Sequence, residues 1–478
     1  MSIFNGIEFK NSFGELPGEL YTKQSWSSFE KTQLVAFNES LARELGFDPE
    51  IDPHEMIKVF NGEISVLDSE PLAMAYAGHQ FGSWVPELGD GRGILFGQIK
   101  TASGLRDLHI KGAGKTPYSR FADGRAVLRS TIREYLCGEA MHGLNVPSSR
   151  SLIMYGGNEP VFRETTETAA MMVRVARTHI RFGNFEYLKH NGKSQYLEDL
   201  LNHVIDEYYS ELSDEKDKYA KFFDNTVKAT AQLIAHWQAI GFSHGVMNTD
   251  NMSILGETFD YGPFGFLENY NPEYICNHSD HEGRYAFNNQ PSIGHWNCQA
   301  LAAALEGLVP EKKLMESLGK YGTYFYDHLA DLYRAKLGLK NKDAQDLKLV
   351  EGLLNWLKEA GLDYTNFFRN LHQIHEPNQS IFADAEGEEW LDSFMKRFNQ
   401  EKISTKESRV MMLKNNPKYI LRNYLAHEAI KKAEEGDFSE VEKLHKILSE
   451  PFDDHPGMES YAIASPDWGK NLEISCSS

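Results

Sequence analysis

The chain has 478 residues, and its 49 Lys and Arg against 69 Asp and Glu give a formal net charge of -20. A negative charge of this size repels a phosphate backbone, so the composition argues against nucleic acid as the main partner. Hydrophobic residues at 41% and aromatic residues at 12% are typical of a folded globular protein and argue against a disordered chain.

The sequence gives no sign of export or of a membrane anchor. Residues 1–20 lack the basic and apolar regions of a signal peptide, and no stretch approaches the roughly 18 apolar residues of a membrane span. The 4 cysteines are too few for a disulfide scaffold in a chain of this length. We therefore expect a cytoplasmic enzyme without a membrane partner.

The pattern of the first part of the chain predicts a β-rich lobe behind an extension. Residues 1–75 mix short apolar pieces with Pro and Gly, which predicts an irregular N-terminal extension packed on the body. Residues 76–195 contain glycine-rich turns between β-favouring runs, and one amphipathic helix is expected over 126–144. The β-favouring runs of this lobe lie at 94–99, 108–111, 151–157, 160–164 and 170–180.

The remainder of the chain is largely helical by its apolar periodicity. Residues 196–295 are expected to form a helical lobe, which a loop over residues 244–262 interrupts. Residues 296–478 are expected to form a helical C-terminal extension with a cysteine-containing tail. The fold class predicted from this order is α+β, with two lobes and an extension at each end.

The motif GDGRG, residues 89–93, is suited to close contact with phosphate groups. Gly89 and Gly91 allow the backbone to approach a ligand, and Arg92 adds a positive charge. A glycine-rich turn with an exposed arginine is the ordinary alternative, so this motif alone is weak.

Lys111 and Glu134 are placed like a kinase lysine and its helix glutamate. Lys111 ends a predicted strand, and Glu134 lies on the next helix, nearly opposite its apolar stripe. An ion pair between them would aim the ammonium group at phosphate oxygens. The alternative is two unrelated surface charges.

The loop over residues 244–262 resembles a kinase catalytic loop that lacks its base. The pattern H-x-D-x-x-x-x-N followed by D-F-G matches His244, Asn251 and Asp260, and it puts Val246 at the aspartate position. Valine cannot accept a proton, so ordinary kinase chemistry has no base here. Asp250 is the nearest replacement, and its alternative role is to cap the loop in an Asx turn.

These motifs occur in kinase order, and longer segments make the chain resemble the selenoprotein O family in its bacterial branch. The resemblance covers nearly the whole chain and is carried by AGHQFG, PELGDGRG, LHIKGAGKTPYSRFADGRA, STIREYL, HGVMNTDNMSILGETFDYGPFGF and NHSDHEGRYAFNNQP. It implies a protein-kinase-like two-lobed fold, described as a pseudokinase, that binds ATP in a reversed orientation. The implied reaction is transfer of AMP to Ser, Thr or Tyr hydroxyls of proteins, with release of pyrophosphate.

The resemblance also implies roles for individual residues. Asp250 would be the base, Asn251 and Asp260 would hold Mg²⁺ or Mn²⁺, and Lys111 would contact phosphates while it pairs with Glu134. The other residues implied for the nucleotide site are Gly89, Gly91, Arg92, Asp123, Gly124, Arg174 and Arg181, besides Asp260 itself. Side chains alternate along a strand, so Arg174 and Arg181 can share a site only if the strand bends or ends between them.

Other functions stay open at this point. One is a catalytically inert pseudokinase scaffold that binds nucleotide, although two retained metal ligands argue against it. Another is phosphoryl transfer with Asp250 as a relocated base. A third is transfer of UMP from UTP with Mn²⁺, which the sequence does not distinguish from AMP transfer.

The cysteines suggest two further hypotheses. A zinc site could be formed at non-standard spacing by Cys276, His278, His281, His295 and Cys298. Some relatives carry selenocysteine near the C-terminus, where this chain has Cys476. A disulfide between Cys276 and Cys476 would tie the tail across the activation region and make activity redox-sensitive, whereas two inert thiols are the alternative.

Overall fold

The computed structural model describes residues 3–376, 381–382, 384–470 and 472–474. Within these residues, the main sheet has nine strands in the order β2-β4-β7-β8-β11-β10-β3, with β1 paired to β7 and β9 paired to β11. All of these pairs are antiparallel. The long strands at its centre are β7 (Gly93–Thr101), β8 (Gly104–Lys111), β10 (Arg150–Phe162) and β11 (Thr166–Ala176).

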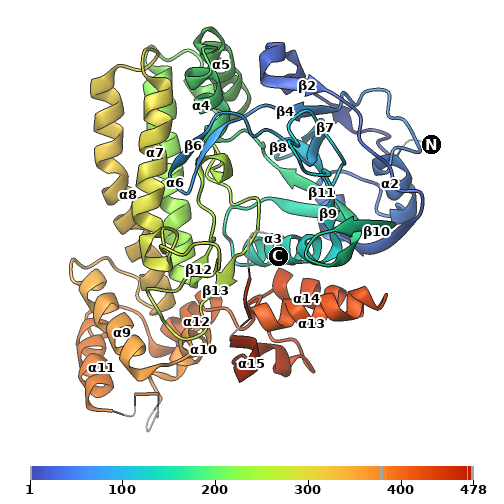
Figure 1. Ribbon diagram of the computed structural model, residues 1–478. Coiled ribbons are helices and arrows are strands. Elements are labelled where there is room, and N and C mark those ends of the chain that lie inside the picture. Colours follow the sequence, from blue (N-terminus) through green and yellow to red (C-terminus); the bar gives the residue numbers. More distant parts are fainter. Residues whose placement is uncertain (1–2, 377–380, 383, 471, 475–478) are drawn as a thin grey trace.

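Helix α3 (Leu128–Gly143) follows β9 (Ala126–Val127) and packs on the sheet against β10 and β11 (Figure 1). This confirms the helix expected over 126–144. Apolar side chains of α3 are buried in the core, whereas its Glu134 is buried beside Lys111. The helix therefore connects the core of the sheet with a charged site.

The first 75 residues are more regular than the sequence predicted. They contain β1 (Glu8–Phe9), β2 (Tyr21–Lys23), β3 (Thr32–Phe37), β4 (Leu72–Met74), α1 (Glu39–Glu44) and α2 (Pro53–Phe60). These strands pair with residues far along the chain, as Ala36 does with Met154 in β10. Such short strands are stabilised by their partners in the sheet, so local sequence gives little indication of them.

The strand predicted at 170–180 is shifted toward the N-terminus, since β11 spans Thr166–Ala176. Strand β11 ends at Ala176, and an unexpected helix, α4 (Phe182–His190), begins soon after it. The Asn184 side chain accepts a hydrogen bond from the Arg181 backbone N–H at 2.8 Å and so caps this helix. The chain leaves the sheet between Ala176 and Arg181.

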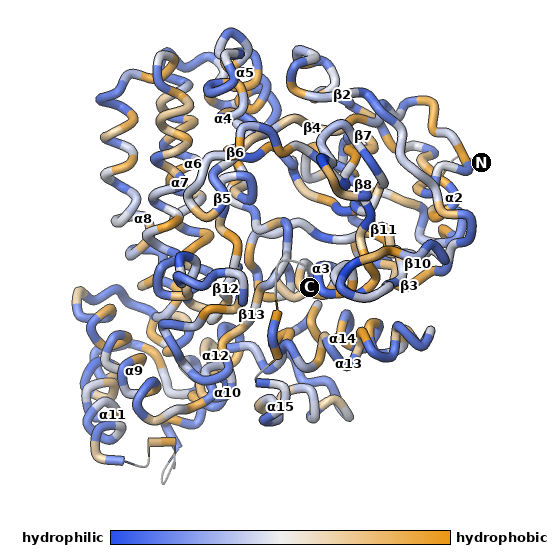
Figure 2. Tube along the Cα trace, in the orientation of Figure 1, coloured by the Kyte–Doolittle hydropathy of each residue, from blue (hydrophilic) through white to orange (hydrophobic). Residues whose placement is uncertain are grey.

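Long helices form the second part of the molecule (Figure 1). They are α5 (Leu197–Tyr208), α6 (Lys218–Ile240), α7 (Gln290–Leu305) and α8 (Glu311–Lys336). Figure 2 shows apolar and polar residues alternating along α6, as expected for a helix with one buried face. Between α6 and α7, the pair β12 (Phe242–Ser243) and β13 (Gly265–Phe266) brackets the predicted loop.

The C-terminal helices belong to two different cores. A smaller core includes residues of α9 (Asp346–Ala360), α10 (Tyr364–Asn370), α11 (Ala385–Phe398) and α12 (Thr405–Asn415). The helices α13 (Asn423–Glu434) and α14 (Ser439–Ser449) pack on α3 instead, and α15 (Asp467–Lys470) packs on α13. None of the described helices combines the length and apolar character that crossing a membrane requires.

Candidate active site

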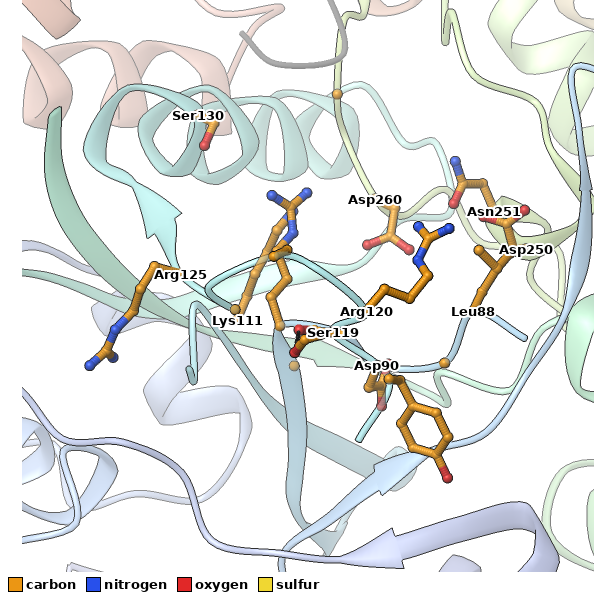
Figure 3. A pocket seen from close by; sticks show the side chains of 18 of the residues that line it. Leu88, Asp90, Lys111, Ser119, Arg120, Arg125, Ser130, Asp250, Asn251 and Asp260 are labelled. Carbon is orange, nitrogen blue, oxygen red and sulfur yellow. Dashed lines mark hydrogen bonds between the residues drawn. The ribbon is translucent and has the colours of Figure 1, made fainter. Parts of the chain in front are cut away.

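A pocket of about 610 Å³ is lined by the glycine-rich turn, the end of β8, the segment after it, and the loop that contains Asp250. It brings together nearly every residue predicted for the site. These are Gly89, Gly91, Arg92, Lys111, Asp123, Gly124, Arg174, Arg181, Asp250, Asn251 and Asp260. Figure 3 labels Lys111, Asp250, Asn251 and Asp260 among them. Glu134 lies behind this surface, paired with Lys111.

The glycine-rich turn is held from behind by the segment that follows β8. Gly89 has a φ of +67°, and a Cβ there would lie 2.3 Å from the ring of Tyr118. The Ser119 hydroxyl donates a hydrogen bond to the Gly91 carbonyl, and the Tyr118 backbone N–H donates to the Thr116 hydroxyl at 3.1 Å. Glycine is therefore required at position 89, and the turn is fixed in place.

The predicted ion pair between Lys111 and Glu134 is present. Both side chains are buried, and Arg174 lies on the other side of the glutamate, with Nη1 3.4 Å from Oε1. Burial lowers the pKa of the Lys111 ammonium, and the carboxylate of Glu134 opposes this shift. The glutamate thus holds two cations at the wall of the pocket.

Asp260 lies between Arg174 and Arg181. Arg174 Nη1 contacts its Oδ1, and Arg181 Nη1 lies 2.7 Å from its Oδ2. Burial raises the pKa of this carboxyl, but Arg174, Arg181 and Lys111 outweigh burial, so the pKa lies well below its ordinary value. On one straight strand these two arginines would point to opposite faces. Because β11 ends at Ala176, between them, both can reach one carboxylate.

The residues Thr249–Asn251 form a single 3₁₀ turn that contains Asp250. The side-chain NH₂ group of Asn251 donates a hydrogen bond to the Val246 carbonyl at 3.0 Å. The amide oxygen of Asn251 takes no part in that bond. Burial raises the pKa of Asp250 to about 7, while Arg181 opposes the shift. A carboxyl group and an amide group therefore line the pocket together with Asp260.

The sequence did not predict several cations of the pocket. Arg163, in the turn after β10, binds the carboxylate of Asp123 through two hydrogen bonds of 2.8 and 3.0 Å. Arg120 has a φ of +52°, and Figure 3 shows its guanidinium pointing toward Asp260. Arg125 also lines the pocket. Arg120 and Arg125 lie inside a motif that the sequence singled out, whereas Arg163 lies outside all of them.

The residues present fit a divalent ion of the kind that binds with a nucleotide. Within the described part of the chain, no group of three or more His, Cys, Asp or Glu could hold a metal by itself. Mg²⁺ in phosphate-transfer sites needs only one or two protein carboxylates, because phosphate oxygens and water complete its shell. Asp260 and the Asn251 amide oxygen provide ligands of this type in one pocket.

The zinc hypothesis is wrong for the described residues, because no such group of ligands occurs among them. Cys276 is buried, and its thiol lies 3.3 Å from the Ser243 hydroxyl oxygen. The ring of His295 packs on Tyr321 with centroids 5.1 Å apart. Cys298 is also buried and free. The candidate ligands therefore do not converge.

The predicted disulfide between Cys276 and Cys476 stays a prediction, because Cys476 lies outside the described residues. Burial raises the pKa of the Cys276 thiol to about 12. The described end of the chain runs nearby, since the Ile474 carbonyl accepts a hydrogen bond from the His278 backbone N–H at 2.9 Å.

Comparison with known proteins identifies the family of the chain. The family described as protein adenylyltransferase SelO matches residues 4–449. The protein nucleotidyltransferase YdiU of Aliivibrio salmonicida is 48% identical over 486 residues, and that of Vibrio parahaemolyticus is 48% identical over 490. The YdiU protein of Myxococcus xanthus is 46% identical over 488 residues, and in all three cases 100% of both chains is covered.

These matches show that the chain is a nucleotidyltransferase and therefore an enzyme. It belongs to the protein adenylyltransferase SelO family, which confirms the family that its motifs resemble.

Proposed function

We propose that this enzyme transfers AMP from ATP to Ser, Thr or Tyr hydroxyls of other proteins and releases pyrophosphate. The observation that carries this proposal is the convergence in one pocket of cations and acids suited to a triphosphate and a divalent ion. The cations are Arg92, Lys111, Arg174 and Arg181, and the acids are Asp250 and Asp260. Arginine and lysine bind phosphate oxygens through charge-assisted hydrogen bonds, which supports a polyanionic ligand.

We also propose that the fold is protein-kinase-like. An antiparallel sheet with one packed helix precedes a helical part, and a lysine on a strand pairs with a glutamate on that helix. The loop with Asn251 and Asp260 follows helix α6. These features support the kinase comparison on which the residue roles rest.

In the proposed reaction, Asp250 accepts the proton of the acceptor hydroxyl as its oxygen attacks the α-phosphorus of ATP. The bond between the α-phosphorus and the oxygen that bridges to the β-phosphorus breaks, and pyrophosphate leaves. Lys111 and the arginines neutralise the charge that collects on the leaving group. The reversed orientation of ATP would bring its α-phosphate, and not its γ-phosphate, to the acceptor.

A bound Mg²⁺ or Mn²⁺ would supply electrostatic stabilisation of the phosphate oxygens. Asn251 and Asp260 would hold it. Because both Arg174 and Arg181 contact Asp260, they also keep this carboxylate ionised and oriented for the metal.

Intact-mass spectrometry of the products tests the proposal. The enzyme and a set of candidate acceptor proteins are incubated with ATP or with UTP, in Mg²⁺ or Mn²⁺, and the added group is identified by its mass. We expect addition of AMP from ATP. Addition of a phosphoryl group would contradict the proposal. Addition of UMP alone would show that the substrate is UTP and not ATP.

A further inference from the structure

The motif AGHQFG forms a hairpin that lies on the turn containing Asp250. Its strands are β5 (Gly78–Gln80) and β6 (Ser83–Val85). The backbone N–H of His79 donates to the Thr249 hydroxyl at 2.7 Å. The backbone N–H of Phe81 donates to the side-chain oxygen of Asn248 at 3.2 Å. The hairpin thus contacts two successive residues that precede Asp250.

Two residues of this hairpin, Gly78 and Gln80, contact the carboxylate of Asp250. The side-chain amide of Gln80 donates to Oδ2 of Asp250 at 3.3 Å. A Cβ at Gly78 would lie 2.6 Å from Oδ1, so Oδ1 rests directly on the glycine backbone. Among the described residues, Oδ1 is buried and has no hydrogen-bond partner. Gln80 is therefore the side chain that fixes the carboxylate.

The hairpin is anchored independently of Gln80. His79 Nδ1 lies 2.6 Å from Oε1 of the buried Glu186 on α4, and its ring packs on Trp296 of α7. The Tyr285 hydroxyl accepts a hydrogen bond from the Phe81 backbone N–H at 3.0 Å. Because these contacts hold the hairpin from α4, from α7 and from the segment before α7, loss of the Gln80 amide leaves its backbone in place.

We propose that Gln80 is a positioning residue that orients the carboxylate of Asp250 toward the acceptor hydroxyl. The proposal rests on the proposed function, in which Asp250 is the base. A carboxylate oxygen has two lone-pair directions, so Oδ2 can accept the Gln80 amide and still take a proton. The missing side chain of Gly78 leaves space for the carboxylate, and the Gln80 amide sets the orientation of the carboxylate.

The test replaces Gln80 by leucine, which is similar in size and has no donor. We expect kcat for AMP transfer to fall about 10- to 100-fold, as for other misplaced catalytic groups. KM for ATP and the Kd for nucleotide are expected to change by less than about twofold, because the Gln80 amide bonds to Asp250 and, among the described residues, to no cation of the pocket. If the leucine variant folds poorly, Gln80→Met takes its place, because methionine also lacks a donor and is flexible. The same fall in kcat is expected.

Ser83→Ala is the matched control, because Ser83 is exposed on the second strand of the same hairpin. It is expected to retain the wild-type kcat. Equal losses in Ser83→Ala and Gln80→Leu would overturn the proposal, since they would point to the stability of the hairpin as the cause.

A double-mutant cycle separates positioning from a structural role. In the Asp250→Asn background, Gln80→Leu is expected to lower the residual transfer rate no further, because its effect passes through the carboxylate. Independent losses that multiply would overturn the positioning role. If Asp250→Asn keeps full activity, the proposed base is wrong and this inference falls with it. If Asp250→Asn is inactive while Gln80→Leu is fully active, only the positioning role is wrong.

Discussion

The buried Arg181 forms an ion pair with the partly exposed Asp260, in which Arg181 Nη1 lies 2.7 Å from Oδ2 of the carboxylate. The same nitrogen donates to the backbone carbonyl of Asp250 at 2.6 Å. One guanidinium group thus joins the proposed metal ligand to the proposed base. Loss of Arg181 should therefore disturb both groups.

Arg181→Met is expected to destabilise the protein by about 1.5–3 kcal/mol, because it removes hydrogen bonds to a charged group while Arg174 still pairs with Asp260. It should also abolish AMP transfer. Arg181→Lys keeps the charge but not the planar group, and we expect an intermediate loss of activity. Urea unfolding and transfer assays measure both effects.

Arg43→Met is the control for this prediction. Its side chain is 59% exposed and lies 3.0 Å from the carboxylate of Glu39, which is 69% exposed. Exposed pairs contribute about 0–1 kcal/mol, so a small change in stability is expected. A loss as large as that of Arg181→Met would show that the hydrogen bonds of Arg181 do not explain its effect.

Lys111→Met is expected to lower kcat about 10²- to 10³-fold, because it removes a cation that stabilises the leaving group. Glu134→Gln should have a smaller effect, since the ammonium group remains but loses its charged partner. Steady-state kinetics with ATP check both variants. Wild-type kcat in Lys111→Met would show that this ammonium does not act on the phosphates.

Val246→Asp restores a carboxylate at the position where a kinase has its base, and we expect no gain of phosphoryl transfer. The orientation of ATP decides which phosphate meets the acceptor, and this change does not alter the cations that line the pocket. Transfer from γ-labelled ATP is the measurement. Appearance of γ-label on the acceptor would mean that the missing aspartate alone separates this enzyme from a kinase.

Removal of divalent ions is expected to abolish transfer, and Mg²⁺ or Mn²⁺ should restore it. Asp260→Ala should not be restored by either ion, because it lacks the carboxylate ligand. Asn251→Ala keeps that carboxylate and should require more metal for half-maximal activity. Full activity of the wild-type enzyme after exhaustive chelation would contradict the metal assignment.

The pair His236 and His328 predicts acid sensitivity. Their Nε2 atoms lie 2.9 Å apart between α6 and α8, and burial lowers the pKa of His236 to about 4. The unfolded chain takes up this proton near pH 6.5, so it binds more protons than the folded state below about that pH. The contribution of His236 to stability is therefore complete above about pH 6.5 and falls toward about pH 4.

Urea unfolding at pH values of about 8 and about 5, on either side of the ordinary histidine pKa, checks this prediction. His236→Gln is expected to lose less stability between the two pH values than the wild type does. His54→Gln serves as the control, because His54 is exposed on α2, and it should behave like the wild type. Identical pH dependence in His236→Gln and wild type would exclude the histidine pair as the cause.

Much of the site could be predicted from the sequence because its residues occur in short motifs. The ion pair of Lys111 with Glu134 follows from a strand and a helix that are close together in the chain. Arg174 and Arg181 are an odd number of residues apart, so they could share a site only if the strand bent or ended between them. The strand ends at Ala176. The roles of these residues in catalysis remain predictions.

Long-range contacts were not predicted. Strand β3 pairs with β10, which lies far along the chain, so the apolar pattern of the first 75 residues did not indicate a place in the sheet. Arg163 reaches Asp123 only because the β10–β11 turn lies beside the segment after β8. No motif relates these two residues in the sequence.

The position of the label in ATP distinguishes transfer of AMP from transfer of a phosphoryl group. Wild-type enzyme and Asp260→Ala are incubated with α-labelled or γ-labelled ATP and acceptor protein, in Mg²⁺ or Mn²⁺ and under reducing conditions. We predict that wild-type enzyme transfers label from the α-phosphate only and that Asp260→Ala transfers none. Label from the γ-phosphate only would make the enzyme a kinase with a relocated base and would contradict the proposed reaction.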